Sequence, residues 1–381
     1  MRIISETSEL AAFSAEIASS SFIAVDTEFM REKTFWPILC LVQVAAEGAE
    51  AIIDPLADDI DLAPLLEVLT KKDVVKVFHA ARQDIEIFYR LLDEVPAPLF
   101  DTQIAAMACG FGDQIGYEPL MRTLVNAKID KGSRFTDWSR RPLTDAQLSY
   151  ALSDVTHLRE AYPLLREKLK SENREHWVEE EMQALLNNEL YYVAPTDAWR
   201  RLRLRGVKPK ELGPLIKLAE WREREAHVRD VPRSRILKDD GIYELARLQP
   251  KTTKDLSRAR SIPNGFERSS AGAAIIESIS EGVKIPRDEL PDVFKPDRQK
   301  APADVVDLLK VLLKRQCEQY GVAPKLIASA SDLEAIARGD IEGVPAMSGW
   351  RREVFGDAAI SLKNGDLALK LSNSAVEIVK V

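Results

Sequence analysis

Three strand-like segments near the start of the chain follow one another so closely that no helix fits between them. They span residues 21–29, 36–46 and 49–55, and only Glu47 and Gly48 separate the last two. Parallel neighbours need a crossover of about a dozen residues or more, whereas antiparallel strands can be joined by short turns. The spacing therefore predicts an antiparallel meander of three strands.

Helical patterns alternate with a further strand over the rest of the first 170 residues. A strand is expected at 74–80. Thr144 and Gln147 match a capping box at the start of a long amphipathic helix that ends near Lys170. This mixture predicts an α/β domain with a mixed sheet flanked by helices. The other expected helices are at 62–69, 82–93, 102–109 and 117–126.

The remainder of the chain is predicted to be mainly helical. We expect a charged helical connector at 171–207, a helical domain at 208–288 and a second helical domain at 303–381. A Pro-rich, charged stretch at 285–302 has the composition of a linker. The two helical domains are similar in length and helical order, which favours a diverged duplication. The alternating tail at 375–381 suggests a short strand.

Charge is unevenly distributed along the chain. The net charge is −8, but residues 1–75 hold 5 basic and 14 acidic side chains, whereas residues 200–235 hold 12 basic and 5 acidic ones. The basic part could hold a phosphate-bearing substrate while carboxylates in the acidic part hold cations. The alternative is that both are solvated surfaces. The best RNA-backbone candidates are Arg200, Arg201, Arg203, Arg205, Lys208 and Lys210.

Several classes of protein are disfavoured by the composition. No apolar run approaches the roughly 18–20 residues of a membrane span, and the first twenty residues lack the apolar core of a signal peptide. The three cysteines are far apart, which disfavours a disulfide framework or a Cys-rich zinc site and indicates a cytoplasmic location. No GxGxxG, GxxxxGK[ST] or GxSxG motif occurs, so we expect neither a nucleotide cofactor nor serine hydrolase chemistry.

Four carboxylates and one tyrosine are the candidate catalytic residues of the first domain. Asp26 and Glu28 share one face of the first strand. Asp84 lies at the start of a later helix, and Tyr150 and Asp154, four residues apart, share one face of the last helix. Each feature alone has an ordinary explanation: a polar strand end, a helix-start charge or an amphipathic helix. Together, in this order, they fit a two-metal phosphodiester site.

Residues 1–170 resemble the DEDD 3′→5′ exonuclease family, in its tyrosine-bearing subclass. The resemblance lies in VDTEF (25–29), PILCLVQ (37–43), VFHAARQDIEIF (77–88), FDTQIAA (100–106), DWSRRPL (137–143) and LSYALSDVTHL (148–158). Residues 208–285 resemble an HRDC domain, and residues 303–370 resemble a more diverged second copy. The resemblance implies an α/β ribonuclease H-like exonuclease domain followed by two all-α HRDC-like domains.

The resemblance also implies roles for the site residues. Asp26, Glu28 and Asp154 would bind one divalent ion, Mg²⁺ or Mn²⁺. Asp26 would bridge to a second ion held by Asp84, and Tyr150 would orient the attacking water. The implied activity is that of a 3′→5′ exoribonuclease that releases nucleoside 5′-monophosphates and trims precursor tRNA. The helical domains would bind the RNA, either tRNA precursors or other small structured RNAs.

Six further side chains are weaker candidates for substrate contacts. His79 ends a strand and Gln43 lies mid-sheet, so both could equally be core residues. The loop at 131–143 interleaves basic and aromatic side chains, which suits stacking on unpaired bases and binding of phosphates. The alternative is a surface loop around a buried tryptophan. Asp101, by contrast, is expected to cap a helix. The candidates in the loop are Arg134, Trp138, Arg140 and Arg141.

Two other functions stay open at this point. The first is the same chemistry on DNA, and matched RNA and DNA substrates would separate it because contacts to the 2′-OH tell the two apart. The second is a catalytically silent RNA-binding scaffold. Salt-sensitive binding without metal-dependent cleavage would favour that function.

Overall fold

The computed structural model describes the whole chain except residues 130–131, 133–135, 263–264 and 295–299. Its contacts divide the chain into two units. The C-terminal helical block belongs to the same unit as the N-terminal domain. The sequence had predicted separate domains that follow one another along the chain. The exact boundaries expected from the sequence stay predictions. Unit 1 comprises Met1–Glu28, Leu41–Asn187 and Arg298–Val381, and unit 2 comprises Phe29–Cys40 and Asn188–Asp297.

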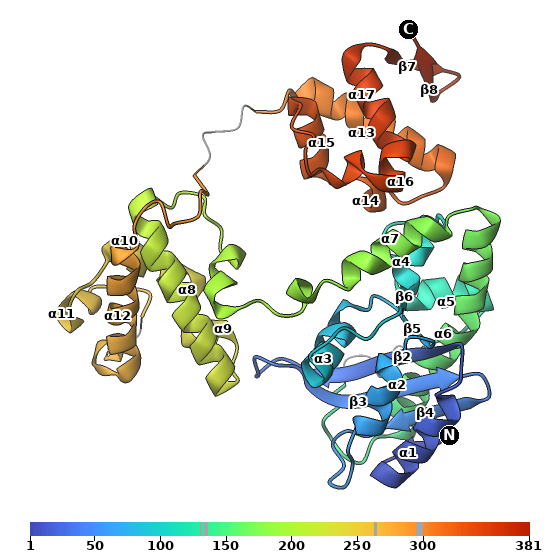
Figure 1. The fold of residues 1–381 in the computed structure, drawn as a ribbon, viewed down its shortest axis with the longest axis horizontal. Coiled ribbons are helices and arrows are strands. Elements are labelled where there is room, and N and C mark those ends of the chain that lie inside the picture. The colour runs from blue at the N-terminus through green and yellow to red at the C-terminus, as the bar shows by residue number, and fades with distance from the viewer. Residues whose placement is uncertain (130–131, 133–135, 263–264, 295–299) are drawn as a thin grey trace. The chain divides into compact units, whose positions relative to one another are not determined.

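The N-terminal part of unit 1 contains a six-stranded sheet (Figure 1). The strands are β1 (Ile3–Ile4), β2 (Phe22–Met30), β3 (Ile38–Ala46), β4 (Ala49–Ile53), β5 (Val75–Phe78) and β6 (Leu99–Asp101). Their order is β1-β4-β3-β2-β5-β6, with β3 and β4 antiparallel. The pairs β1–β4, β2–β5 and β5–β6 are parallel. The expected mixed sheet is confirmed, as is the adjacency of the three meander strands.

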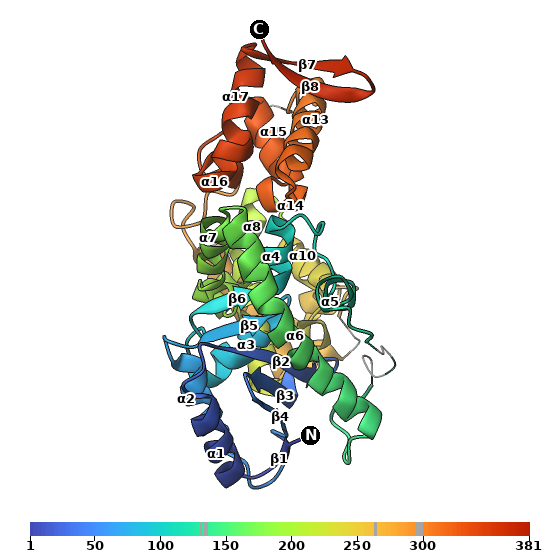
Figure 2. The same ribbon diagram turned by 90° about the vertical axis from the view of Figure 1, so that its right-hand side faces the viewer.

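The long helix α6 (Asp145–Ser171) lies across one face of this sheet (Figure 2). It begins at the predicted capping box: Gln147 N–H donates to Thr144 Oγ1 at 3.2 Å, and Thr144 N–H donates to Gln147 Oε1 at 3.0 Å. Its Val155 and Leu158 are buried in one core with sheet residues such as Ala24. The other helices of this part are α1 (Thr7–Ile17), α2 (Ala63–Thr70), α3 (Arg82–Leu92), α4 (Thr102–Ala108), α5 (Tyr117–Val125) and α7 (Glu175–Leu185).

The C-terminal block of unit 1 packs against α4 and α7. The indole of Trp350 stacks on that of Trp177 with ring centroids 4.4 Å apart and planes 12° apart. Arg174 donates to the carbonyl oxygens of Ala108 at 2.7 Å and Gly321 at 3.2 Å. The strand expected at the C-terminus is confirmed as β8, whereas β7 was not expected. The elements are α13 (Ala303–Tyr320), α14 (Pro324–Ile327), α15 (Ala330–Arg338), α16 (Gly349–Arg351), α17 (Asp357–Asn364), β7 (Leu367–Ser372) and β8 (Ala375–Lys380).

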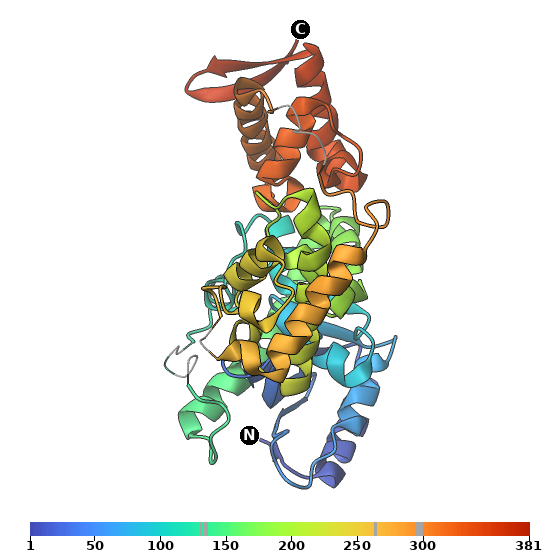
Figure 3. The same ribbon diagram turned by 90° about the vertical axis from the view of Figure 1, so that its left-hand side faces the viewer.

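Unit 2 is built around two helices that lie side by side, α8 (Pro209–Arg229) and α12 (Ser270–Lys284) (Figure 3). They meet at a glycine pair, because a Cβ atom on Gly213 would lie 2.1 Å from the carbonyl oxygen of Gly282. Fully buried leucines and isoleucines form the core around this pair. The shorter helices are α9 (Arg233–Ile236), α10 (Asp239–Leu248) and α11 (Thr253–Leu256).

All three cysteines, Cys40, Cys109 and Cys317, are buried free thiols, as expected for a chain without a disulfide framework. Within the described residues, no helix combines the length and the apolar character that a bilayer crossing requires.

Candidate active site

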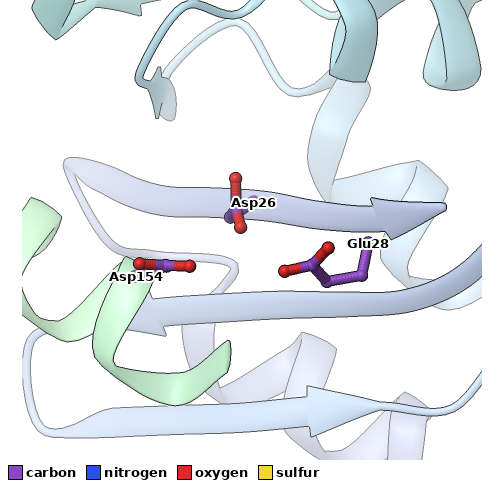
Figure 4. Close-up of side chains that lie close together, drawn as sticks. All are labelled: Asp26, Glu28 and Asp154. Carbon is purple, nitrogen blue, oxygen red and sulfur yellow. The ribbon is translucent and has the colours of Figure 1, made fainter. Parts of the chain in front are cut away.

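Three carboxylates converge where β2 and α6 face one another. Asp26, Glu28 and Asp154 each offer an oxygen atom, and these atoms all lie within 4.8 Å of one another. Strand alternation puts Asp26 and Glu28 on one face of β2, and Figure 4 shows the Glu28 carboxylate directed toward Asp154 of α6. Asp154 is buried, while Asp26 and Glu28 are partly exposed. The structure thus brings together three of the four carboxylates that the sequence singled out.

The fourth carboxylate, Asp84, lies in the first turn of α3 and outside this group of three. Its side chain is buried, and its Oδ1 atom accepts a hydrogen bond of 2.5 Å from Thr27 Oγ1. Thr27 is the residue between Asp26 and Glu28, so β2 contacts Asp84 directly. The Asp26 carboxylate is also close enough to raise the pKa of Asp84.

Asp101 holds the turn that leads into α3. As expected, it caps α4, accepting a hydrogen bond of 2.8 Å from the Gln103 N–H. The same carboxylate accepts hydrogen bonds from the N–H groups of Ala80 and Ala81, at 3.0 and 2.9 Å. Ala80 has a φ of +57°, a left-handed conformation that is unfavourable for a residue with a Cβ atom. The bonds to Asp101 offset that cost and fix the start of the helix that carries Asp84.

The electrostatics of the cluster favour a bound cation. Burial, and after it the Asp154 carboxylate, holds the pKa of Asp26 well above its usual range. Burial and the Asp26 carboxylate do the same to the pKa of Asp84. The charged groups that shift these two pKa values are therefore other carboxylates. A divalent cation would neutralise this repulsion, and oxygen ligands are those that Mg²⁺ and Mn²⁺ prefer.

Tyr150 faces the same cluster from α6. Burial raises its pKa above the usual range, and the carboxylates of Asp154, Glu28 and Asp26 raise it further. Its hydroxyl lies near the Asp154 side chain, which contributes to this shift of the pKa. The phenol is therefore protonated near neutral pH and available as a hydrogen-bonding group, but not as a base.

Tyr117 is a site residue that sequence reasoning missed. Its hydroxyl donates hydrogen bonds to the backbone carbonyls of Ser153, at 3.0 Å, and Asp154, at 2.5 Å. It thereby ties α5 to α6 at the residue that carries a cluster carboxylate. The contact joins residues that are 37 positions apart, and no local sequence pattern around Tyr117 predicts it.

The candidates for substrate contacts on the sheet are buried. Gln43 is fully buried in β3, and both polar atoms of its amide lack a hydrogen-bond partner among the described residues. His79 Nδ1 lies 3.0 Å from Thr102 Oγ1, and the imidazole meets the Tyr117 ring edge-on. Burial lowers the pKa of His79, so the imidazole is neutral near pH 7. Contacts of Gln43 and His79 with substrate stay predictions.

The loop before α6 carries the other candidates for substrate contacts. Some of them are buried or ion-paired within the protein, and others are exposed. Trp138 is 2% exposed and packs on Tyr150 with ring centroids 6.2 Å apart, so little of its face is open to a base. Arg141 forms a bidentate ion pair with Asp54, with both N–O distances 2.6 Å. Arg140 is exposed and pairs with Asp137 at 3.2 Å. Arg134 lies outside the described residues. Binding of RNA by these side chains stays a prediction.

Comparison with known proteins agrees with the fold and the order of its domains. Residues 1–170 match the family described as 3′-5′ exonuclease, and residues 211–279 match the HRDC domain. Ribonuclease D from Jannaschia sp. is 49% identical over 99% of both chains, and ribonuclease D from Nitrobacter hamburgensis is 46% identical over 99% of this chain and 98% of its own. The crystal structure of Escherichia coli RNase D superposes with a TM-score of 0.83 at 26% identity, covering 95% of this chain and 98% of that one.

Fold, carboxylate cluster and domain order define a 3′→5′ exonuclease of the DEDD type that carries an HRDC domain. Exonucleases of this class use divalent metal ions. The full-length similarity goes further: the chain belongs to the ribonuclease D family and is a 3′→5′ exoribonuclease. RNA is accordingly its substrate. The expected exonuclease domain with a mixed sheet, the HRDC domain and a helical C-terminal part are all confirmed. That the C-terminal part is a second HRDC copy stays a prediction.

Proposed function

We propose that this exoribonuclease matures the 3′ ends of precursor tRNA and of other small structured RNAs. It removes extra nucleotides one at a time and releases nucleoside 5′-monophosphates. The observation that carries the proposal is the convergence of Asp26, Glu28 and Asp154 within 4.8 Å. The choice of substrate is supported by the resemblance to the Escherichia coli enzyme, which is described as an exoribonuclease involved in structured RNA processing.

Two divalent ions, Mg²⁺ or Mn²⁺, fit the residues present. Asp26, Glu28 and Asp154 would hold one ion, and Asp26 together with Asp84 would hold the other. The repulsion among these carboxylates supports this assignment, because it is relieved when cations bind. When bound, such ions lower the pKa of a coordinated water and stabilise negative charge on the phosphate.

The chain's own residues orient the reactants. Tyr150 keeps its proton and can hold the attacking water by a hydrogen bond beside the carboxylate of Asp154. Thr27 fixes the side chain of Asp84, and Tyr117 fixes the helix at Asp154. Such fixed positions matter because a misplacement of about 1 Å can cost roughly 10²-fold in rate.

The test is a time course on 5′-labelled precursor tRNA with a short 3′ trailer, in Mg²⁺, in Mn²⁺ and in EDTA. We expect a ladder that shortens by one nucleotide at a time, is abolished by EDTA and is absent with Asp154→Asn. Glu160→Gln is the matched control, because Glu160 is an exposed carboxylate on the same helix. Internal cuts, or full activity of Asp154→Asn, would overturn the site assignment.

The substrate is tested separately with three molecules that share one trailer: precursor tRNA, an unstructured RNA and a DNA. We expect RNA to be cleaved in preference to DNA, and the trailer on tRNA to be removed with the highest kcat/KM. Equal kcat/KM for the two RNAs would remove the tRNA proposal and leave a general exoribonuclease. We also place the enzyme in the cytoplasm, which its three free thiols support and which cell fractionation would test.

A further inference from the structure

Trp138, in the loop that leads into α6, lies buried beside the tyrosine of the candidate active site. Its side chain is 2% exposed, and its ring centroid is 6.2 Å from that of Tyr150, with the two planes 33° apart. Aromatic rings at such a distance stabilise one another beyond the effect of the area they bury. The sequence suggested that this indole stacks on an unpaired base, whereas in the structure its ring contact is with Tyr150.

The backbone at Trp138 is connected to the end of strand β4. Arg141 Nη1 donates a hydrogen bond of 2.7 Å to the Trp138 carbonyl oxygen. The same guanidinium forms the bidentate pair with Asp54, the residue that directly follows β4. A bidentate pair fixes the orientation of a guanidinium as well as its position. Arg141 therefore holds the Trp138 backbone in a fixed place relative to β4.

The loop is also tied to the first turn of α6, the helix that carries the active-site tyrosine. Gln147, a buried residue of that turn, donates from Nε2 to Thr136 Oγ1 at 3.0 Å. Next to Thr136, the Asp137 carboxylate accepts a hydrogen bond of 3.1 Å from the Ser139 N–H and so closes a tight turn around Trp138. The residues on both sides of Trp138 are thus fixed by hydrogen bonds.

The indole ring itself is held by packing rather than by a polar contact. Its Nε1 atom is buried and has no hydrogen-bond partner within the part of the chain that the structure describes. Phenylalanine at this position would keep an aromatic ring and would lose only that unused donor and some of the ring area. A substitution that keeps a ring can therefore be compared with one that removes it.

We propose that Trp138 is a positioning residue for cleavage, which holds the ring of Tyr150 so that the phenol hydroxyl meets the attacking water. The inference rests on the water-orienting role proposed above for Tyr150. A partly exposed tyrosine on a helix can exchange between staggered rotamers unless a neighbour blocks the alternatives. Trp138 is such a neighbour, because its own backbone is anchored to β4 and its loop to α6.

The effect belongs to the rate of the chemical step rather than to metal binding. The carboxylates of the site lie on β2, α3 and α6, whereas Trp138 lies on the loop before α6. Loss of the indole therefore leaves the metal ligands in place and releases the tyrosine ring. A misplacement of a reacting group by about 1 Å can cost roughly 10²-fold in rate, so a small change in the ring is sufficient.

The experiment is a double-mutant cycle in single-turnover cleavage of an RNA tetranucleotide by the full chain at saturating Mg²⁺. The proteins compared are wild type, Trp138→Leu, Tyr150→Phe and the double variant. We expect Trp138→Leu to lower the cleavage rate constant by up to about 10²-fold, and by no more than Tyr150→Phe does. In the Tyr150→Phe background, Trp138→Leu should change the rate constant by less than about twofold, because the hydroxyl that it positions is already absent.

Matched variants separate positioning from general damage to the core. Trp138→Phe should recover most of the rate lost in Trp138→Leu. Trp350→Leu is the control, since Trp350 is also 2% exposed but stacks on Trp177 in the C-terminal block, and this variant should keep the wild-type rate constant. The Mg²⁺ concentration for half-maximal cleavage should be the same in Trp138→Leu and wild type.

A second variant keeps the test decisive if thermal unfolding shows that Trp138→Leu does not fold. Arg141→Gln removes the hydrogen bonds to the Trp138 carbonyl and to Asp54 while it leaves the indole in the chain. It should lower the rate constant less than removal of the indole would, and this loss should again disappear in the Tyr150→Phe background.

The outcomes distinguish this inference from the proposed function. Losses that multiply in the double variant would show that Trp138 does not act through the Tyr150 hydroxyl, and would overturn the inference. A wild-type rate constant in Trp138→Leu would do the same, as would an equal loss in Trp350→Leu or a raised Mg²⁺ midpoint with an unchanged saturating rate. Full activity of Tyr150→Phe would instead remove the role proposed for the tyrosine, and the positioning role with it.

Discussion

Thr27 donates a hydrogen bond of 2.5 Å to Asp84, and so joins strand β2, which carries Asp26 and Glu28, to helix α3, which carries Asp84. Asp26 and Glu28 flank Thr27 in β2 and direct their side chains to one face of the strand, while the side chain of Thr27 lies on the other face. One tripeptide thus contributes to the position of three of the four carboxylates. The hydrogen bond also lowers the pKa of Asp84, against the effects of burial and of Asp26.

Replacing Thr27 by valine should weaken metal binding with little change in the fold. The variant keeps the shape of the side chain but removes the hydroxyl, so the pKa of Asp84 should rise and its ionised form should be less available. Loss of a contact that orients a ligand typically costs about 10- to 100-fold in metal affinity. We expect the Mg²⁺ concentration for half-maximal cleavage to rise by that factor. Thr123→Val, which removes an exposed hydroxyl bonded to the Pro119 carbonyl, is the control, and an unchanged midpoint for Thr27→Val would contradict the role given to Thr27.

The pKa of Asp26 predicts how stability depends on pH. Because its folded-state pKa is raised, the folded, metal-free chain keeps a proton at Asp26 where the unfolded chain has lost it. Stability should therefore fall as pH rises from about 3.9, the unfolded value, through the folded value. Asp26→Asn lacks this loss, so in EDTA its Tm should exceed that of wild type by a margin that grows with pH. Each 1 kcal/mol would appear as roughly 2–4 °C in thermal unfolding.

Two comparisons make the prediction for Asp26 specific. Asp58→Asn, at an exposed aspartate, should show no growing margin. Saturating Mg²⁺ should shrink the margin for Asp26→Asn, since bound cations remove the repulsion that the substitution relieves. A margin that is constant with pH would mean that Asp26 is ionised in both states.

Tyr150→Phe should reduce kcat without reducing metal affinity. The phenol orients water through its hydroxyl, so its loss should cost up to about 10²-fold in kcat, the scale of a misplaced reactant. The pKa of Tyr150 is raised far beyond the assay range, so the pH–rate profile should keep its shape in the variant. Mg²⁺ titration and pH profiles of single-turnover cleavage measure both effects. A profile that loses its basic limb in Tyr150→Phe would instead identify the tyrosine as a titrating group.

Local periodicity predicted two pairs of candidate side chains, each on one face of its element. Asp26 and Glu28 share a face because strand side chains alternate, and Tyr150 and Asp154 share one because helix positions four apart do. The supporting contacts follow no such rule. Thr27 and Asp84 are 57 residues apart, and Tyr117 and Asp154 are 37 apart. Such pairs come into contact only when whole helices and strands pack together, and a single sequence does not predict that packing.

The same distinction between local and long-range structure applies to the fold. The meander and the capped helix α6 were predicted, since turn spacing and a capping box are local signals. Strand β1 has two residues and is defined by its pairing with β4 rather than by its own pattern. Likewise, the C-terminal block joins unit 1 through contacts such as that of Trp177 with Trp350, which are far apart in the chain.

Arg140 and Arg141 should differ sharply although they are neighbours in one basic loop. Arg141 makes two 2.6 Å contacts with Asp54 and is 28% exposed, whereas the side chain of Arg140 is 82% exposed. Hydrogen bonds to charged groups contribute about 1.5–3 kcal/mol, so Arg141→Gln should lower the free energy of unfolding by about that amount. Arg140→Gln should leave unfolding unchanged within ~0.5 kcal/mol and, if Arg140 contacts RNA, raise KM. Denaturant unfolding and steady-state cleavage distinguish the two, and equal stability of both variants would show that the Asp54 pair contributes little to the loop.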